Sequence, residues 1–180
     1  DSLAPFVAGG FPSLGISGGG STGNLSFGLQ PYWHGTERFV VWLADSGGTE
    51  RGGSNVSAPQ EFNLTVLPVN NAPTFELAAP SVPVLEGSGR TSVLLVVNIS
   101  RGSPTGNEDE QNLTFFVARV ADGAANLTGE LPSVVLNPDG KTANLSFVAQ
   151  PYWYGVDTWV LTLEDSGGVE SGGGDASAAQ

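Results

Sequence analysis

The residues with the clearest chemical signature in this chain are asparagines followed two positions later by Ser or Thr. Such an Asn-X-Ser/Thr triplet, in which X is any residue but Pro, accepts an N-linked glycan in the secretory pathway. Seven of the 11 asparagines occur in this context, whereas random placement of the 30 Ser and Thr residues would give about two. The seven are Asn24, Asn55, Asn63, Asn98, Asn112, Asn126 and Asn144. This excess predicts N-linked glycans and an extracellular or cell-surface location.

Side chains for catalysis are scarce. His34 is the only histidine, and the chain contains no cysteine. A Ser-His-Asp triad therefore has no possible base other than His34. The lack of cysteine also excludes disulfide bonds. We expect no enzymatic activity and no cofactor, with bound calcium as the one alternative.

The calcium alternative starts from two aspartates. Asp45 and Asp165 each begin an Asp-Ser-Gly-Gly tetrapeptide. Such an aspartate either bonds to its own backbone in a turn or serves as an oxygen ligand for calcium. The net charge of −12 could attract cations or serve only for solubility, and it argues against binding to nucleic acid phosphates.

The elements that carry these residues come from an internal repeat. The 37 residues from Asn24 align without a gap with the 37 residues from Asn144, and 21 of the pairs are identical. The two segments lie 120 residues apart, which predicts one domain per repeat. The chain then holds about one and a half repeats.

Alternating apolar residues within the repeat predict β-strands. Phe39, Val41 and Leu43 fall on one face of a strand, and their counterparts 120 positions later are Trp159, Leu161 and Leu163. Short alternating stretches separated by Gly, Pro, Asn and Ser predict an all-β sandwich without helices. Alternation places Asn24, Asn63, Asn112 and Asn144 on outward faces, where a glycan fits. It explains part of the excess of asparagines, but it does not require Ser or Thr two positions later.

The same alternation leaves some large apolar residues facing outward. Val40 and Trp42 lie on the outer face of the first copy, and Phe116 lies outward in the second domain. An exposed apolar patch suggests contact with another domain or protomer. We expect these three residues to be assembly contacts.

Two prolines and a pair of asparagines mark the predicted boundary between repeats. We assign residues 1–68 to the C-terminal part of one β-sandwich repeat, 69–73 to a short linker, and 74–180 to the next repeat. The counterpart of the strand at residues 61–67 would lie past Gln180, so we expect chain continuation or a neighbouring molecule to supply it. No apolar run approaches the roughly 20 residues of a membrane helix, and we expect no membrane insertion of this segment.

Five short motifs resemble those of tandem cadherin-like and immunoglobulin-like repeats in large extracellular surface proteins. They are Val-Asn-Asn-Ala-Pro-Thr-Phe at 69–75, Pro-Tyr-Trp-X-Gly at 31–35 and 151–155, Asp-Ser-Gly-Gly at 45–48 and 165–168, Asn-Ile-Ser-X-Gly at 98–102, and Ser-Ala-Pro-Gln-Glu-Phe at 57–62. The resemblance implies immunoglobulin- or cadherin-like sandwiches repeated in tandem. Dense glycosylation makes the chain similar to algal mastigoneme proteins, which form hair-like filaments on flagella.

The resemblance also bears on calcium. It implies Glu86 as a further candidate ligand, because many cadherin-like domains have a ligand glutamate near this position. However, cadherin junctions that bind calcium carry Asp-X-Asn-Asp-Asn, whereas this junction reads Leu-Pro-Val-Asn-Asn and lacks the anionic ligands.

These observations together predict a structural repeat segment of an extracellular glycoprotein filament or cell-surface appendage, whose partners are other copies or chains of the same filament. The alternative is a calcium- or carbohydrate-binding adhesin module. Aromatic residues of the Pro-Tyr-Trp turns, Trp33 and Trp153, would then form a sugar-binding platform in place of a packed corner.

Overall fold

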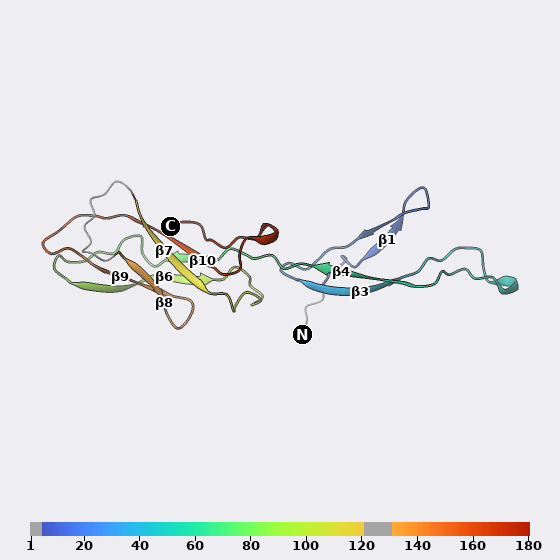
Figure 1. The fold of residues 1–180 in the computed structure, drawn as a ribbon, viewed down its shortest axis with the longest axis horizontal. Helices are drawn as coiled ribbons and strands as arrows, with labels where there is room; N and C mark the ends of the chain where they lie inside the picture. Colours follow the sequence, from blue (N-terminus) through green and yellow to red (C-terminus); the bar gives the residue numbers. More distant parts are fainter. Residues whose placement is uncertain (1–4, 121–130) are drawn as a thin grey trace. The chain divides into compact units, whose positions relative to one another are not determined.

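Ten β-strands carry almost all the regular structure in the computed structural model, which describes residues 5–120 and 131–180 (Figure 1). The chain divides into unit 1, Asp1–Pro68, and unit 2, Val69–Gln180. The described ranges contain no α-helix, only two single-turn 3₁₀ helices, η1 and η2. The prediction of an all-β fold is confirmed. None of the described residues forms a helix with the length and apolarity of a membrane span.

Unit 1 is built from two separate antiparallel pairs of strands. Its elements are β1 (Ser13–Ile16), β2 (Gly23–Ser26), β3 (Gly35–Val41), η1 (Glu50–Gly52) and β4 (Gln60–Val66). β1 pairs with β2, and β3 pairs with β4. Phe6 is the only buried apolar side chain in the described part of this unit, and its ring lies 6.0 Å from that of Phe39. The ring of Phe39 in turn stacks on Phe62 of β4, with the centroids 5.4 Å apart.

Unit 2 contains two sheets that share one core. Its elements are β5 (Thr74–Leu77), β6 (Arg90–Ser100), β7 (Leu113–Arg119), β8 (Ser133–Leu136), β9 (Ala143–Val148), β10 (Trp159–Asp165) and η2 (Glu170–Gly172). One sheet has the strand order β5-β6-β9-β8, and the other pairs β10 with β7. The core takes side chains from both sheets, namely Phe75, Val96, Ile99, Ala143, Leu161 and Leu163.

The matching stretches of the two units form the same local structure. The register of β1 with β2, Ser13↔Ser26 to Ile16↔Gly23, recurs 120 residues later in β8 and β9 as Ser133↔Ser146 to Leu136↔Ala143. The η1 and η2 turns also match, since Gly53 N–H donates to Glu50 O and Gly173 N–H donates to Glu170 O. Local sequence is therefore sufficient to specify these hairpins and turns.

The Pro-Tyr-Trp-X-Gly turn shows why its residues recur together. Tyr152 has a φ of 61°, a left-handed conformation that tightens the turn. The ring of Trp153 then folds over Gly155, where a Cβ would lie 2.6 Å from the indole. The first copy repeats this arrangement with Trp33 over Gly35. Both tryptophans are half-buried, as expected for a packed corner.

Residues 70–73 of the predicted linker 69–73 are half-buried or buried and belong to unit 2, whereas Val69 is exposed. Asn70 Nδ2 donates to Asp165 Oδ1 at 2.8 Å and to the carbonyl of Gly174 at 2.7 Å. Asn71 O lies so close to Gly102 that a Cβ there would approach it to 2.3 Å, and Gly102 has a φ of 105°. The Asn-Asn pair therefore serves as an anchor and not as a flexible hinge.

Candidate glycosylation and assembly sites

Four of the seven candidate glycosylation asparagines lie exposed in the structure. Asn24 is on β2, Asn63 is on β4, Asn98 is on β6, and Asn112 immediately precedes β7. Strand alternation accounts for Asn63, because its neighbours Phe62 and Leu64 are half-buried on the other face. These four side chains have room for a glycan.

Asn98 differs from the other three in its backbone. Its φ of 53° is left-handed, a conformation that Asn tolerates better than most residues. Its Nδ2 donates to Glu76 Oε2 at 2.7 Å, and an N-linked sugar would be attached at this nitrogen. A glycan at Asn98 would therefore have to alter this hydrogen bond.

The remaining candidates are less open. Asn55 is half-buried, and so is Asn144, which we expected to face outward with room for a glycan. β9, which carries Asn144, lies between β6 and β8, whereas β2, which carries Asn24, pairs only with β1. Asn126 lies outside the described residues.

One of these triplets has a structural reason for its serine. Ser57 Oγ, in the triplet of Asn55, accepts a hydrogen bond from Leu43 N–H at 2.9 Å. The second copy repeats this contact between Ser177 Oγ and Leu163 N–H at 3.0 Å, although an aspartate, Asp175, stands where Asn55 would be. The serine therefore recurs for its backbone contact, independently of any glycan.

The two Asp-Ser-Gly-Gly aspartates form turns with their own backbone. Asp45 Oδ1 accepts from Gly47 N–H at 2.7 Å, and Asp165 Oδ1 accepts from Gly167 N–H at the same distance. Asp165 Oδ2 is buried without a hydrogen-bond partner. Across residues 5–120 and 131–180, no three His, Asp or Glu side chains gather closely enough to hold a metal ion. The structure thus does not bring the candidate ligands Asp45, Glu86 and Asp165 together as a metal site.

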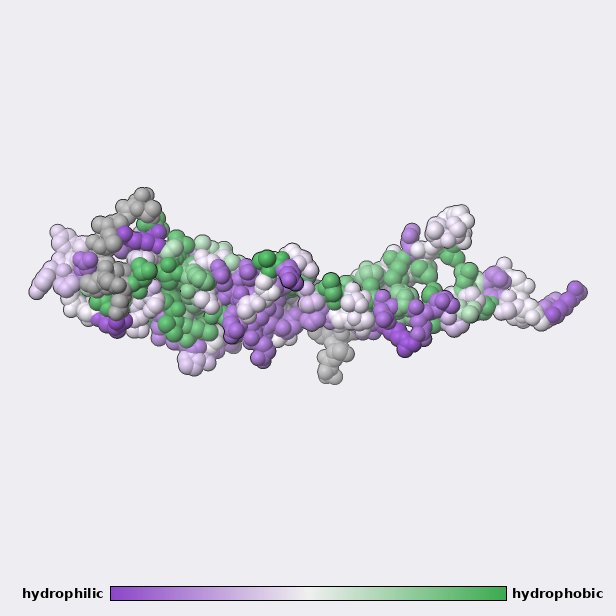
Figure 2. All heavy atoms as spheres, in the orientation of Figure 1, coloured by the Kyte–Doolittle hydropathy of each residue, from purple (hydrophilic) through white to green (hydrophobic). Residues whose placement is uncertain are grey.

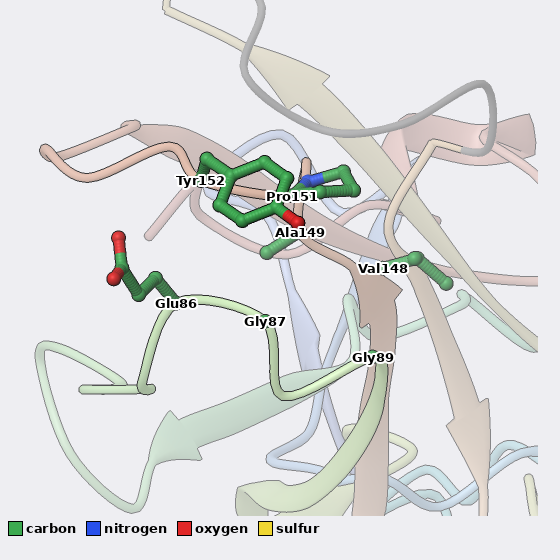
Figure 3. A pocket seen from close by; sticks show the side chains of 7 residues that line it. All are labelled: Glu86, Gly87, Gly89, Val148, Ala149, Pro151 and Tyr152. Carbon is green, nitrogen blue, oxygen red and sulfur yellow. The ribbon is translucent and has the colours of Figure 1, made fainter.

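Glu86 instead borders a cavity in unit 2. The cavity has a volume of ≈ 440 Å³ and lies between the turn at Glu86–Gly89 and the Pro-Tyr-Trp turn (Figure 3). Figure 3 shows Glu86 and Tyr152 extending from the two loops that border it. The Tyr152 side chain is 90% exposed, whereas Trp153 is half-buried. The open aromatic face of this turn is therefore that of tyrosine.

The three predicted assembly contacts are all exposed. Val40 and Trp42 lie in and just after β3, and Phe116 lies on β7. Each alternates with a half-buried neighbour, which places it on the outer face of its sheet. Figure 2 shows apolar side chains gathered on the visible face of each unit. Unit 1 exposes further large apolar side chains, including Leu14, Ile16, Phe27 and Leu43.

Sequence reasoning missed a buried carboxylate that stabilises the start of unit 2. Glu108 is 5% exposed; its Oε1 accepts from the backbone and side-chain N–H groups of Asn71, and its Oε2 accepts from Ser103 N–H at 2.7 Å. The Asn-Asn junction and the glycine of Asn-Ile-Ser-X-Gly were the available signals, because both lie against this contact.

Comparisons of this chain with protein-family models, with curated proteins and with solved structures found no match.

Proposed function

We propose that this chain is a structural repeat segment of an extracellular glycoprotein filament or cell-surface appendage, of the mastigoneme type. The observation that carries the proposal is the combination of a repeated β-unit with an excess of glycosylation triplets in its sequence. Repeated domains extend a chain along one direction, and glycans protect the exposed faces and edges. Neither feature requires a catalytic centre.

The recurrence of local structure supports a tandem array with a period of 120 residues. Hairpins, turns and the Asp-Ser-Gly-Gly contacts coincide at this interval in units 1 and 2. Two sheets sharing one core in unit 2 support a sandwich of the immunoglobulin or cadherin-like type. Under this proposal Asn70 binds the Asp-Ser-Gly-Gly turn of its own repeat and Asn71 binds Glu108 of the same repeat, so both asparagines of the junction are anchored to the repeat that they begin.

Exposed apolar residues support assembly with other copies or chains. Val40 and Trp42 are exposed in and just after β3, whose partner β4 carries Asn63, and Phe116 is exposed on β7, which Asn112 immediately precedes. Apolar patches of this kind mark contact surfaces on extracellular proteins. Glycans and protomer contacts would then divide the outer surface between them.

The test uses the protein from its native source. Intact-glycopeptide mass spectrometry should find glycans on at least four of the seven asparagines, with Asn24, Asn63 and Asn112 among them because their side chains are open. Electron microscopy of the same preparation should show filaments or surface appendages labelled by an antibody against this segment. Mostly bare asparagines together with label on isolated, soluble particles would contradict the proposal.

A carbohydrate-binding adhesin module is the rival proposal, and the cavity beside Tyr152 is what favours it. An exposed aromatic ring and a carboxylate, that of Glu86, are suitable partners for the apolar face and the hydroxyl groups of a sugar. Glycan-array binding that is lost in Tyr152→Ala but retained in Tyr32→Ala would favour the adhesin. Equal binding or no binding by both variants would leave the filament as the better proposal.

A further inference from the structure

Strand β7 has a free edge on the side away from β10. In the described part of the chain its sheet consists of β10 and β7, so only one side of β7 is hydrogen-bonded to a strand (Figure 1). Val120 N–H, just after β7, donates to Thr158 O at 3.0 Å, and every second residue before it directs its backbone groups to the same side. The residues between them direct their N–H and C=O groups to the free side. They are Leu113, Phe115, Val117 and Arg119.

The outward backbone groups of these four residues are unpaired. Across residues 5–120 and 131–180, no group hydrogen-bonds their N–H or C=O on the free side of β7. Such a row of open donors and acceptors matches only another extended strand and is a template for strand addition.

The outer strands of the other sheet are protected against such pairing, whereas β7 is not. β5 and β8 are only four residues long. β5 carries Glu76 and has an irregular register, and β8 is followed closely by Pro138. β7 has seven residues and contains no Pro, Gly, Lys or acidic residue. In a chain with a net charge of −12, two copies would meet little repulsion along this strand.

Full overlap of two β7 strands fixes one register. β7 runs from Leu113 to Arg119, so its midpoint, Phe116, faces itself when two copies pair in antiparallel orientation. Leu113 then exchanges hydrogen bonds with Arg119 of the partner, and Phe115 does so with Val117 of the partner. All four outward residues are satisfied. A shift by two residues would leave one of them on each copy facing a position outside the strand.

The side chains of β7 suit this register. Phe116 is exposed on the outer face, and it would lie at a position without direct hydrogen bonds, where opposite side chains approach most closely. Two aromatic rings that meet there stabilise the pair beyond their buried area. On the inner face Phe115 and Val117 already pack partly against the core of unit 2. Pairing would cover the sides of these two residues that the core leaves open.

We propose that unit 2 pairs with unit 2 of a second copy through the free edge of β7, with Phe116 at the two-fold axis. The second copy is the partner because the edge requires a strand with open backbone groups and no carboxylates, and β7 itself is such a strand. A two-fold contact is closed, so it joins two chains and does not grow further by itself. The inference rests on the proposed function, because this contact is the joint through which neighbouring chains would associate.

Substitution of the self-facing residue tests the pair in the 180-residue chain. Phe116→Lys and Phe116→Glu each place like charges directly opposite one another, so each variant alone should dimerise about tenfold more weakly in sedimentation equilibrium. An equimolar mixture of the two variants places opposite charges across the joint and should recover dimers that contain one chain of each. The control is Val135→Lys, which changes an exposed valine on β8 and should dimerise like the natural chain.

Recovery in the mixture cannot come from misfolded chains, because the mixture contains nothing but the two variants. A natural chain that stays monomeric up to about 1 mM would overturn the proposal. So would a mixture that dimerises no better than its two components.

Hydrogen exchange tests which edge is used. As the chain concentration rises, the amides of Phe115 and Val117 should gain protection, whereas those of Thr114 and Phe116 already bond to β10 and should keep theirs. A gain confined to another strand would overturn the proposed edge. Neither experiment involves glycans or the native filament, so their failure would leave the tests of the proposed function untouched.

Discussion

Units 1 and 2 share their local structure but not their burial. Phe147 in unit 2 is 9% exposed, whereas its counterpart Phe27 in unit 1 is 41% exposed. Leu163 is 0% exposed, whereas Leu43 is 58% exposed. The sequences around these pairs are similar, and the hydrogen bonds that Leu43 and Leu163 make with Ser57 and Ser177 are nearly the same. The difference therefore comes from what packs against each unit.

Three strands make that difference. β5, β6 and β7 lie on the two sheets that enclose the core of unit 2, and no counterpart of them is present in the described part of unit 1. Hairpins and turns form from contacts within a few residues, but a core needs a second layer from distant residues. Comparing the two units therefore separates two contributions to the structure of the repeat. Contacts between nearby residues form the hairpins and turns of both units, whereas packing against distant strands buries the side chains of unit 2.

The largest expected effect comes from shortening the matched leucines. Leu163→Ala should lower the free energy of unfolding of unit 2 by about 2–5 kcal/mol, because it leaves a cavity in a closed core. Leu43→Ala, its matched control, should change the stability of unit 1 by less than about 1 kcal/mol, since that side chain is largely in solvent. Urea denaturation followed by NMR signals specific to each unit measures both. Equal losses would mean that Leu43 is covered in solution by residues outside the described part of unit 1.

A smaller difference is expected at the Asp-Ser-Gly-Gly turns. In Gly167→Ala the new Cβ would approach Asn70 Oδ1 to 2.2 Å and Gln111 Nε2 to 2.4 Å, so unit 2 should lose about 1–3 kcal/mol of stability. In Gly47→Ala the new Cβ meets only Asp45 Oδ1, at 2.9 Å, and this side chain can move away. Thermal unfolding of both variants measures the two losses of stability, and the loss in Gly167→Ala should be the larger. A Gly47→Ala loss as large as that of Gly167→Ala would show that unit 1 has an anchor equivalent to Asn70.

The β-hairpin turns should differ in their response to pH. Hydrogen bonds to Asp139, first from the backbone N–H of Lys141 and then from the Thr142 hydroxyl, lower the pKa of its carboxyl group. A pKa lowered by folding contributes stability above the pKa of the unfolded chain, and this contribution is lost as the pH falls through the folded value. The counterpart of Asp139 in unit 1 is Gly19, which cannot titrate.

Hydrogen exchange at the amides of Lys141 and Thr142 should therefore lose protection in acid, and Asp139→Asn should remove this pH dependence. Amides of the loop between β1 and β2 serve as the control within the same sample. A parallel acid response in that loop would mean that the effect comes from general unfolding and not from Asp139.

The smallest effect is expected from removing metal ions. Neither Asp-Ser-Gly-Gly turn needs a cation to position its aspartate, because a backbone N–H already binds each Oδ1. EDTA should leave the melting temperatures of both units unchanged within a degree or two. A fall confined to unit 2 would point to an ion at the unpartnered Asp165 Oδ2.

Alternation made the outer faces of the strands predictable from the sequence. In β7 every second residue is exposed, as the pattern of Leu113–Arg119 predicts, and Phe116 lies on the outer face as expected. Val40 and Trp42 are likewise exposed in unit 1, but Leu43, which we predicted on the inner face, is exposed as well. This success has a local cause, because successive side chains of a strand point to opposite faces whatever the strand packs against.

The candidate glycosylation sites show where this rule stops. Asn24 and Asn144 occupy the same place in the repeat, yet Asn24 is exposed and Asn144 is half-buried. The pattern assigns a face, but the neighbours of a strand decide how open that face is. β9 has a strand on each side, and β2 has only one.

The sequence by itself determined the repeat, the hairpins with their register and the inward and outward faces, because each of these depends on residues close together in the chain. Only the tertiary structure decided where β3 and β10 begin and end, and that Asn70 binds Asp165, 95 positions away. It also decided that Glu108 is buried against the junction at Asn71. These features depend on contacts between segments that are far apart in the sequence. No local pattern predicts such contacts, because the same residues are compatible with an exposed strand or a covered one.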